Sequence, residues 1–368
     1  MRILITGADG YLGRRAVSAL LETTDGEFVL AVRAADAAEL AAKRERLDAE
    51  LGRAAPGRVT VVGADLTRDD ALAEVDPRRV TAIVHAAAVT RFSVDRETAQ
   101  RVNVDGTVRL ARFARRCPDL GRFTLLSTLY TAGRHTGDVP ERRHEDAGFV
   151  NFYEWSKWRA EQHLFDSGLP LSVLRLPTVI AEDDGGTVGQ YNAFHNTLKL
   201  FYYGLLSLMP GEPSTPLALG TAAFTSAAVA HLVRPEVPAG IYHVTPDPAQ
   251  TLTLGQLIDL TFDVYERDDN FRRRNLMRPI YCDRQSFDDM VDIARRLKGG
   301  PIEQAVASVA PFGTQLYLHK TFRNEALRAA WPGYAAPDPL ALADAVCDHL
   351  VASRWGRQPV TRQLEGAL

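Results

Sequence analysis

The first thirteen residues, MRILITGADGYLG (Met1–Gly13), decide the fold. A short apolar run leads into a turn with glycines at positions 7, 10 and 13, and a stretch with apolar residues at helical spacing follows. Strand, glycine-rich turn and helix in this order are typical of a dinucleotide-binding unit. Gly7 permits the tight turn, Gly10 lets the backbone approach a pyrophosphate, and Gly13 lets helix and strand pack closely. The alternative is a glycine-rich connection without a ligand, because the spacing is Gly-x-x-Gly-x-x-Gly rather than Gly-x-Gly-x-x-Gly.

Arg33, at the end of a second strand expected at 27–33, indicates which dinucleotide would bind. An acidic residue about 20 residues after the fingerprint would bind the ribose 2′-hydroxyl of NAD. Arg33 stands there instead, and a guanidinium forms forked, charge-assisted hydrogen bonds with a phosphate. The sequence therefore favours NADPH over NADH. The alternative for Arg33 is a surface ion pair with Asp36.

Short apolar runs alternate with helical patterns up to residue 180. The expected elements are strands at 59–63, 80–85, 123–127 and 171–176, and helices at 96–116 and 152–166. This alternation predicts an α/β fold of the Rossmann type, a doubly wound parallel sheet that binds ligands at the carboxyl ends of its strands. We therefore assign residues 1–180 to a dinucleotide-binding domain, to which a segment at about 220–245 returns.

The pattern loosens after residue 180, and we expect residues 181–368 to form mainly a smaller, mixed α/β substrate-binding lobe that closes over the cofactor, with C-terminal helices. A helix expected at 191–208 carries an apolar stripe. Core packing is the favoured interpretation of the stripe, and a wall for an acyl or aryl substrate is the alternative. The stripe consists of Phe194, Leu198, Phe201 and Leu205. Further expected elements are a strand at 241–244 and helices at 254–265, 285–297, 301–309 and 338–353.

The composition excludes several classes of protein. A net charge of -3 gives no nucleic-acid signature, and no apolar run is long enough to span a membrane. The three cysteines, Cys117, Cys282 and Cys347, are far apart and odd in number, which indicates neither a disulfide framework nor a zinc site. Because the first strand starts at Met1, we expect no signal peptide and a cytoplasmic location. The oligomeric state stays open.

The segment Tyr153-Glu154-Trp155-Ser156-Lys157 is the candidate for the chemistry. On a helix, Tyr153 and Lys157 lie on one face, about one turn apart. A phenol is normally neutral far above pH 7, and a nearby ammonium favours the phenolate and lowers its pKa. Such a pair can transfer a proton near neutral pH. The spacing is common on surface helices, and the fingerprint that precedes it makes it specific here.

Five segments together resemble the extended short-chain dehydrogenases/reductases. They are the glycine fingerprint, Ala86-Ala87-Ala88, Asn103-Val104-x-Gly106-Thr107, Ser127-Thr128, and Tyr153-x-x-x-Lys157. Further details resemble one branch, the thioester reductases and fatty acyl-CoA reductases: Val32-Arg33-Ala34, His85 before the alanines, and Glu161 after Lys157. Members of that branch use NADPH to reduce an acyl thioester on coenzyme A or a carrier protein. The resemblance covers most of residues 1–245.

The resemblance implies a role for each matching residue. Thr128, favoured over Ser127, would hydrogen-bond the substrate carbonyl oxygen alongside Tyr153, which would donate a proton to that oxygen. Lys157 would bind the nicotinamide ribose and lower the Tyr153 pKa, and Asn103 would support Lys157 through water. The residues expected to bind the cofactor are Gly7, Asp9, Gly10, Tyr11, Leu12, Gly13, Arg33, Asp65, Leu66, Ala86, Ala87, Ala88, Tyr153, Lys157, Pro177 and Val179. No metal site is expected, and His195, His231 and His243 are interpreted as structural.

The implied activity is reduction of an acyl thioester to an aldehyde, with further reduction to an alcohol left open. No adenylation or carrier domain is recognisable in these 368 residues. We therefore expect the substrate to arrive as a coenzyme A ester or on a separate carrier protein. Arg272-Arg273-Arg274 would contact coenzyme A phosphates or an acidic carrier helix, although a solvated charge run is the favoured interpretation.

Two other function classes stay open. One is another extended-family enzyme, either a nucleotide-sugar epimerase or dehydratase, or a carbonyl reductase. Arg33 argues against enzymes that hold NAD tightly, and Leu129 after Thr128 argues against a dehydratase, which tends to carry an acid there. The other is a dinucleotide sensor without activity, which would have no need of a proton donor.

Overall fold

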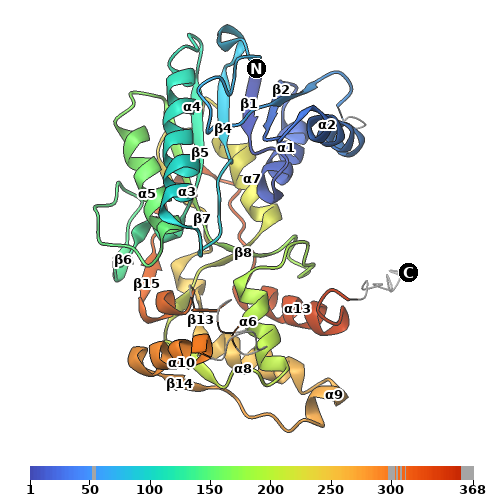
Figure 1. Cartoon of the computed structure of the whole chain (residues 1–368), viewed down its shortest axis with the longest axis vertical. Helices are drawn as coiled ribbons and strands as arrows, with labels where there is room; N and C mark the ends of the chain where they lie inside the picture. The colour runs from blue at the N-terminus through green and yellow to red at the C-terminus, as the bar shows by residue number, and fades with distance from the viewer. Residues whose placement is uncertain (52–54, 297–302, 304–305, 307–308, 311, 358–368) are drawn as a thin grey trace. The chain divides into compact units, whose positions relative to one another are not determined.

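The computed structural model describes residues 1–51, 55–296, 303, 306, 309–310 and 312–357, which form two compact units (Figure 1). The first unit comprises Met1–Pro177, Ala222–Pro248 and Thr321–Ala336. The second comprises Thr178–Thr221, Ala249–Lys320 and the chain from Pro337 onward. The chain thus leaves the first unit at Pro177 and returns to it twice. The sequence did not indicate the second return, at Thr321–Ala336.

A seven-stranded parallel sheet forms the centre of the first unit, with the strand order β12-β7-β5-β4-β1-β2-β3. Its strands are β1 (Arg2–Thr6), β2 (Glu27–Val32), β3 (Val59–Gly63), β4 (Ala82–His85), β5 (Arg122–Thr128), β7 (Leu171–Leu176) and β12 (Ile241–His243). The strand order reverses direction between β1 and β4, where doubly wound sheets bind their ligands. The predicted Rossmann-type fold is confirmed.

Helices cover both faces of this sheet (Figure 1). Ile3 and Ile5 of β1 lie in the apolar core with α1 (Tyr11–Thr23), α2 (Ala37–Leu51) and α7 (Ala222–Leu232). Leu4 lies in the core on the other face, with α4 (Gly106–Ala114) and α5 (Phe152–Phe165). Successive side chains of a strand point to opposite faces, so a strand buried on both faces is a continuous apolar run. This explains why the strand at the N-terminus was recognisable.

The single helix expected at 96–116 is instead interrupted. It consists of α3 (Arg96–Ala99), a π-helical turn η2 (Gln100–Asp105) and α4. Asp95 starts the segment, because its carboxylate accepts a hydrogen bond of 2.8 Å from the Thr98 N–H. π-Turns are rare and frequently mark functional sites. The prediction of one continuous helix was therefore wrong at the position of Asn103.

The remaining elements of the first unit are short. They are η1 (Pro77–Arg79), η3 (Leu129–Ala132), α12 (Glu325–Ala330) and the paired strands β6 (Gly137–Val139) and β15 (Lys320–Phe322).

The second unit is mixed α/β. Its helices are α6 (Ala193–Tyr202), α8 (Leu254–Tyr265), α9 (Asp269–Arg272), α10 (Arg284–Arg296) and α13 (Pro339–Ala352), with the 3₁₀ turns η4 (Pro248–Gln250) and η5 (Thr314–Tyr317) beside them. Its strands pair two by two: β8 (Thr178–Ala181) with β11 (Leu219–Thr221), β9 (Leu208–Pro210) with β14 (Ile280–Cys282), and β10 (Pro216–Leu217) with β13 (Leu252–Thr253). The helix expected at 301–309 falls mostly outside the described residues.

Helix α6 is shorter than the predicted 191–208. Asn192 caps its start by accepting from the Phe194 N–H at 3.0 Å, and Gly204, with a φ of 67°, lies just beyond its end. Phe194, Leu198 and Phe201 are buried in the core of the second unit, whereas Leu205 lies past the helix and is exposed. The apolar stripe is therefore core packing within its own unit.

The three cysteines are unpaired thiols. Burial raises the pKa of Cys117 to about 11 and that of Cys347 to about 12, and it also raises the pKa of Cys282. No described helix is both long and apolar enough to cross a membrane. Among the described side chains, no three His, Cys, Asp or Glu residues group as a metal site would require.

Candidate active site

The glycine loop packs directly against the loop that follows β4. Gly7 has a φ of 68°, and a Cβ atom there would lie 2.7 Å from the Ala87 backbone. A Cβ atom on Gly13 would lie 2.1 Å from the Gly7 carbonyl oxygen. The Ala86 N–H donates to the Thr6 carbonyl at 3.1 Å and ties the two loops together. Positions 7 and 13 therefore admit only glycine, as the fingerprint requires.

Helix α1 begins where a pyrophosphate is expected. Gly10 is its N-cap, no described side chain caps it, and its first turn contains no acidic residue. The first N–H groups of a helix have no partner within the helix, and together with the helix dipole they favour an anion. The loop from Gly7 to Gly13 therefore fits a dinucleotide pyrophosphate, with Tyr11 and Leu12 in the first helical turn.

Two cations lie near the end of β2. Arg33 is exposed, and in the described part of the chain it does not pair with Asp36, whose carboxylate accepts from the Glu39 N–H at 2.8 Å. The second cation is Lys43 of α2, which the sequence interpretation missed. Its ammonium donates to the Arg33 carbonyl at 2.6 Å and forms an ion pair of 2.9 Å with Asp9 of the glycine loop. Lys43 thereby neutralises the carboxylate that stands inside the fingerprint.

Asp65 and Leu66 follow β3. The Asp65 carboxylate accepts from the Thr67 N–H and hydroxyl at 2.9 and 2.8 Å. Burial would raise the pKa of Asp65, but these hydrogen bonds and the charges of Arg33 and Arg68 lower it. Leu66 is buried in the apolar core. Asp65 is therefore ionised at neutral pH, and Leu66 is a packing residue whose side chain points into the core.

The start of α5 is fixed by reciprocal capping. The Asn151 side chain accepts from the Glu154 N–H at 3.0 Å and donates to the Glu154 carboxylate at 3.0 Å. The same carboxylate accepts from the Val150 N–H at 3.1 Å. Such an arrangement satisfies N–H groups at the helix start. It determines where Tyr153 and Lys157 stand on the first two turns.

Thr128 and Tyr153 come together at the carboxyl end of β5. Their hydroxyl groups share a hydrogen bond, and the Thr128 oxygen also accepts from the Tyr130 N–H at 3.3 Å. Burial raises the pKa of Tyr153 to about 12, the Thr128 hydrogen bond lowers it, and Glu154 raises it. The expected lowering of the Tyr153 pKa by Lys157 is not among these causes, and burial is the largest of them. Tyr153 is thus a neutral phenol that carries its proton.

Lys157 is buried, and its ammonium donates to the Leu126 carbonyl at 2.7 Å. Burial lowers the pKa of Lys157 to about 8, and Glu161 opposes this effect. Ser127 is already engaged, since its hydroxyl donates to the Glu161 carboxylate at 2.5 Å. Of the two adjacent hydroxyls, Thr128 is therefore the one that faces the Tyr153 phenol.

Asn103 joins the π-turn η2 to two other segments. Its amide oxygen accepts from the Val89 N–H at 2.8 Å, and its amide nitrogen donates to the Val89 carbonyl at 3.0 Å. The same nitrogen donates to Ser156 at 2.9 Å, and Ser156 donates to the Tyr153 carbonyl at 2.9 Å. Both hydrogens of the Asn103 amide are donated to Val89 and Ser156, so a water molecule that links Asn103 to Lys157 would have to bind the amide oxygen.

His85 connects the fingerprint strand to Asn103. The imidazole shares hydrogen bonds with the Thr6 hydroxyl at 2.7 Å and the Thr107 hydroxyl at 2.9 Å. Thr107 in turn donates to the Asn103 carbonyl at 2.6 Å. Burial, and then the charge of Lys157, lower the pKa of His85 to about 3. His85 is therefore a neutral link, which the sequence indicated only as part of a motif.

Three predicted features belong to the end of the first unit or to the second unit. Pro177 follows β7 and ends the first unit, whereas Val179 lies in β8 of the second, where its carbonyl accepts from Asn192 at 2.9 Å. In the run of three arginines, Arg272 pairs with Asp269. Arg274 packs over the rings of Tyr202 and Tyr203, at 5.2 and 5.0 Å from their centroids. These contacts favour a solvated surface run over a phosphate site.

The fold and the clustered side chains define a class, the extended short-chain dehydrogenases/reductases, which are NAD(P)-dependent oxidoreductases. A family profile described as "Male sterility protein" matches residues 5–228, and the chain belongs to this family. The resemblance inferred from the sequence is thereby confirmed.

Relatives and solved structures agree with this assignment. The isonitrile lipopeptide synthase of Streptomyces coeruleorubidus is 32% identical over 212 residues, or 54% of this chain and 14% of that protein. The terminal R domain from the myxalamid PKS-NRPS biosynthetic pathway is 22% identical, with a TM-score of 0.74 over 98% of this chain and 92% of that one. The R domain of a nonribosomal peptide synthetase from Mycobacterium tuberculosis is also 22% identical, with a TM-score of 0.67 over 97% and 92%. At such identities the solved structures establish the fold. The chain spans between 4% and 33% of the length of the curated relatives it matches.

Proposed function

We propose that this chain is an NADPH-dependent reductase that converts an acyl thioester into an aldehyde and a free thiol. The observation that carries the proposal is the hydrogen-bonded pair of Thr128 and Tyr153 at the end of β5, with Lys157 one turn further along α5. This trio suits the reduction of a carbonyl group. The thioester is inferred from the relatives, which include a lipopeptide synthase and fatty acyl-CoA reductases.

The residues that would hold the cofactor are those of the glycine loop and the end of β2. Gly7, Gly10 and the start of α1 suit the pyrophosphate, because the glycines admit a close backbone approach and a helix N-terminus favours an anion. Arg33 supplies a positive charge for a 2′-phosphate, and Lys43 offsets the charges of Asp9 and Glu39. The exposed Arg33 guanidinium, with Lys43 offsetting the nearby carboxylate, supports NADPH over NADH.

Each catalytic side chain has a step that its environment supports. When bound, the reduced nicotinamide supplies hydride to the thioester carbonyl carbon. Thr128 and Tyr153 orient the carbonyl oxygen, and Tyr153 donates its proton to that oxygen, which gives a hemithioacetal. Lys157, one helical turn further along α5, would bind the nicotinamide ribose. The hemithioacetal hydroxyl then returns its proton to the Tyr153 phenolate as the C–S bond breaks, which gives the aldehyde, and the departing thiolate takes a proton from solvent to become the free thiol.

The carrier of the acyl group is a separate part of the proposal. Coenzyme A and a carrier protein both present the acyl chain on a thiol. The similar proteins include a fatty acyl-CoA reductase and a thiolation-reductase di-domain. Further reduction of the aldehyde to an alcohol uses the same three side chains. A cytoplasmic location stays a prediction.

The test is a substrate panel with purified protein. Acyl-CoA thioesters, the same acyl groups on a carrier protein, and the matching aldehydes are each incubated with NADPH or NADH. Loss of NADPH matched by release of one thiol per turnover supports the proposal. Turnover of aldehydes or ketones alone assigns the chain to the carbonyl reductases instead, and better activity with NADH contradicts the role of Arg33 and Lys43.

A further inference from the structure

We propose that Glu161 is a positioning residue of this site: its buried carboxylate, held by Arg175 and Ser127, clamps α5 to the sheet and provides the counter-charge of Lys157. The role rests on the proposed reductase function, because Lys157 is assigned through it. Glu161 lies on α5 four residues after Lys157, so the two side chains share one face of the helix.

The carboxylate of Glu161 is fixed from two strands. Arg175 of β7 donates to it through Nη2 at 2.7 Å and through Nε at 3.1 Å, and both side chains are fully buried. Ser127 of β5 donates at 2.5 Å. Ser127 immediately precedes Thr128, so the clamp acts at the strand end where Thr128 meets Tyr153. A forked guanidinium–carboxylate pair is geometrically specific, which suits a positioning role.

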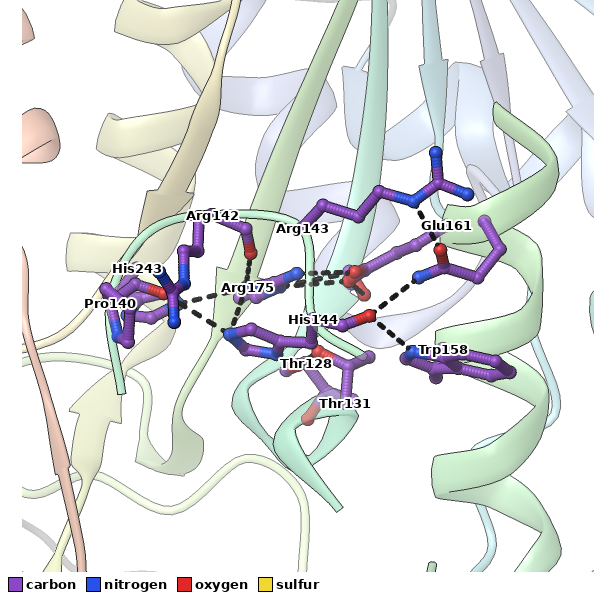
Figure 2. A network of polar contacts seen from close by, with 12 residues as sticks. Thr128, Thr131, Pro140, Arg142, Arg143, His144, Trp158, Glu161, Arg175 and His243 are labelled. Atoms are coloured by element: carbon purple, nitrogen blue, oxygen red, sulfur yellow. Dashed lines mark hydrogen bonds and ion pairs between the residues drawn. The ribbon is translucent and has the colours of Figure 1, made fainter. Parts of the chain in front are cut away.

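His144 connects Arg175 back to α5 (Figure 2). Arg175 Nη1 donates to the Arg142 carbonyl at 3.0 Å and to His144 Nε2 at 2.7 Å. The His144 carbonyl accepts from the Trp158 indole at 2.9 Å and from the Gln162 amide at 3.3 Å, and both residues belong to α5. The contacts therefore run from α5 to β7, through the 142–144 loop, and back to α5. Such a circuit holds the helix at more than one point.

The charges in the clamp are matched one to one. Arg175 faces one carboxylate, and its other buried neighbours, His144 and His243, are imidazoles whose pKa values burial lowers, to about 4 for His144. His243 Nε2 accepts from Arg175 at 3.3 Å, while its Nδ1 donates to the Arg323 carbonyl at 2.8 Å. A buried pair without such compensation would be costly. The Arg175 guanidinium therefore compensates the burial of the Glu161 carboxylate within the clamp.

Glu161 is the charged group that acts on Lys157. Burial lowers the pKa of Lys157, and Glu161 raises it. The other groups around Lys157 supply no negative charge: His85 from β4 is uncharged, the Leu126 carbonyl from β5 accepts a hydrogen bond from the ammonium, and Arg175 from β7 is a cation bound to Glu161. Removing the carboxylate should therefore leave Lys157 deprotonated at a lower pH. Activity would then be lost at a lower pH on the basic side of its profile.

The experiment compares three variants of the full chain. In the double variant Glu161→Gln/Arg175→Met, both buried charges are removed, while the introduced glutamine can still accept from Ser127; a buried pair replaced as a whole is often tolerated. Glu161→Asp keeps the charge. Arg143→Ala is the matched control, because Arg143 also holds α5, through Gln162 at 2.6 Å and Asp166 at 2.8 Å, yet touches neither Lys157 nor Glu161 in the described contacts.

Two readouts are followed against pH: kcat/KM for the thioester, and acylation of Lys157 by a trace reagent, quantified by peptide mass spectrometry. The double variant is expected to shift the basic limb of kcat/KM, and the midpoint of Lys157 labelling, down by about one pH unit. Glu161→Asp and Arg143→Ala should keep the wild-type midpoints. A double variant that folds with unmoved midpoints overturns the proposal. A double variant that cannot fold also overturns the proposal, because the Glu161–Arg175 pair would then be required only for folding. The labelling arm needs no turnover, so it decides the role of Glu161 even if no thioester is reduced.

Discussion

At the scale of single residues, the Tyr153 phenol is protected in its protonated form. Burial raises its pKa to about 12, although the hydrogen bond with Thr128 acts to lower it. Tyr153→Phe removes the proton donor but little volume, so we expect turnover to fall at least about 100-fold, as for the loss of a general acid. Binding of NADPH, measured by its fluorescence, should be unchanged. Tyr130→Phe is the control, since it removes the hydroxyl of a tyrosine whose ring packs 5.4 Å from Phe92, as the Tyr153 ring does at 5.6 Å. Wild-type turnover in Tyr153→Phe would contradict the mechanism.

Arg33 is the residue on which the choice of dinucleotide depends. The Arg33→Ala variant should bind NADPH about 10-fold more weakly or worse, because a hydrogen bond to a charged group contributes about 1.5–3 kcal/mol. NADH affinity should stay within about two-fold, since that ligand lacks the phosphate. Arg68→Ala serves as control, because Arg68 pairs with Asp70 at 3.0 Å. Equal losses for the two dinucleotides would place Arg33 outside the phosphate site.

At the scale of elements, the start of α5 links stability to chemistry. Asn151→Ala removes the cap of the helix that carries Tyr153 and Lys157, and the expected cost is about 1 kcal/mol of unfolding free energy. We also expect a reduced kcat, because the first helical turn frays. Asp338→Ala is a matched control, since Asp338 caps α13 by accepting from the Ala341 N–H at 2.8 Å. Denaturant unfolding and steady-state kinetics separate the two effects: a kcat loss of equal size in Asp338→Ala would show a general loss of folded protein.

Periodic elements with clear boundaries could be predicted from the sequence, and those shaped by distant contacts could not. The strand before Gly7 and the helix around Tyr153 were predicted within two residues. Helix α7 was missed, because it is apolar on all sides and has no periodic pattern. The π-turn was missed because contacts between Asn103 and Val89, fourteen residues apart, determine it. Lys43 was missed for the same reason: its spacing from Glu39 resembles an ordinary surface pair, and its contact with Asp9 appears only in three dimensions.

At the scale of the whole molecule, buried histidines predict a loss of stability in mild acid. Burial lowers the pKa of His85, His144 and His195 from 6.5 to about 3, 4 and 4, and that of His243 well below 6.5. Below pH 6.5 the unfolded chain binds a proton at each site, and the folded chain does not until about pH 4. The unfolding free energy therefore falls as the pH drops through this window. Burial raises the pKa of Glu141 to about 7 and also raises that of Asp348, and these two groups act in the opposite direction against the four histidines.

The measurement is the urea midpoint of unfolding at pH 7, 6 and 5. We expect the midpoint to decrease progressively from pH 7 to pH 5. The decrease should be smaller in His195→Gln, because this variant lacks one of the four histidines that bind a proton only when unfolded. A midpoint that is constant or rises from pH 7 to pH 5 would show that the buried imidazoles do not control acid stability.

The burial of the cysteines has a practical consequence for enzymology. Thiol reagents react with thiolates, and the raised pKa values of Cys117, Cys282 and Cys347 keep all three protonated at neutral pH. The native protein should therefore contribute a low background in a colorimetric thiol assay and tolerate the reagent during turnover. A continuous thiol assay can then be run alongside NADPH oxidation on the same sample.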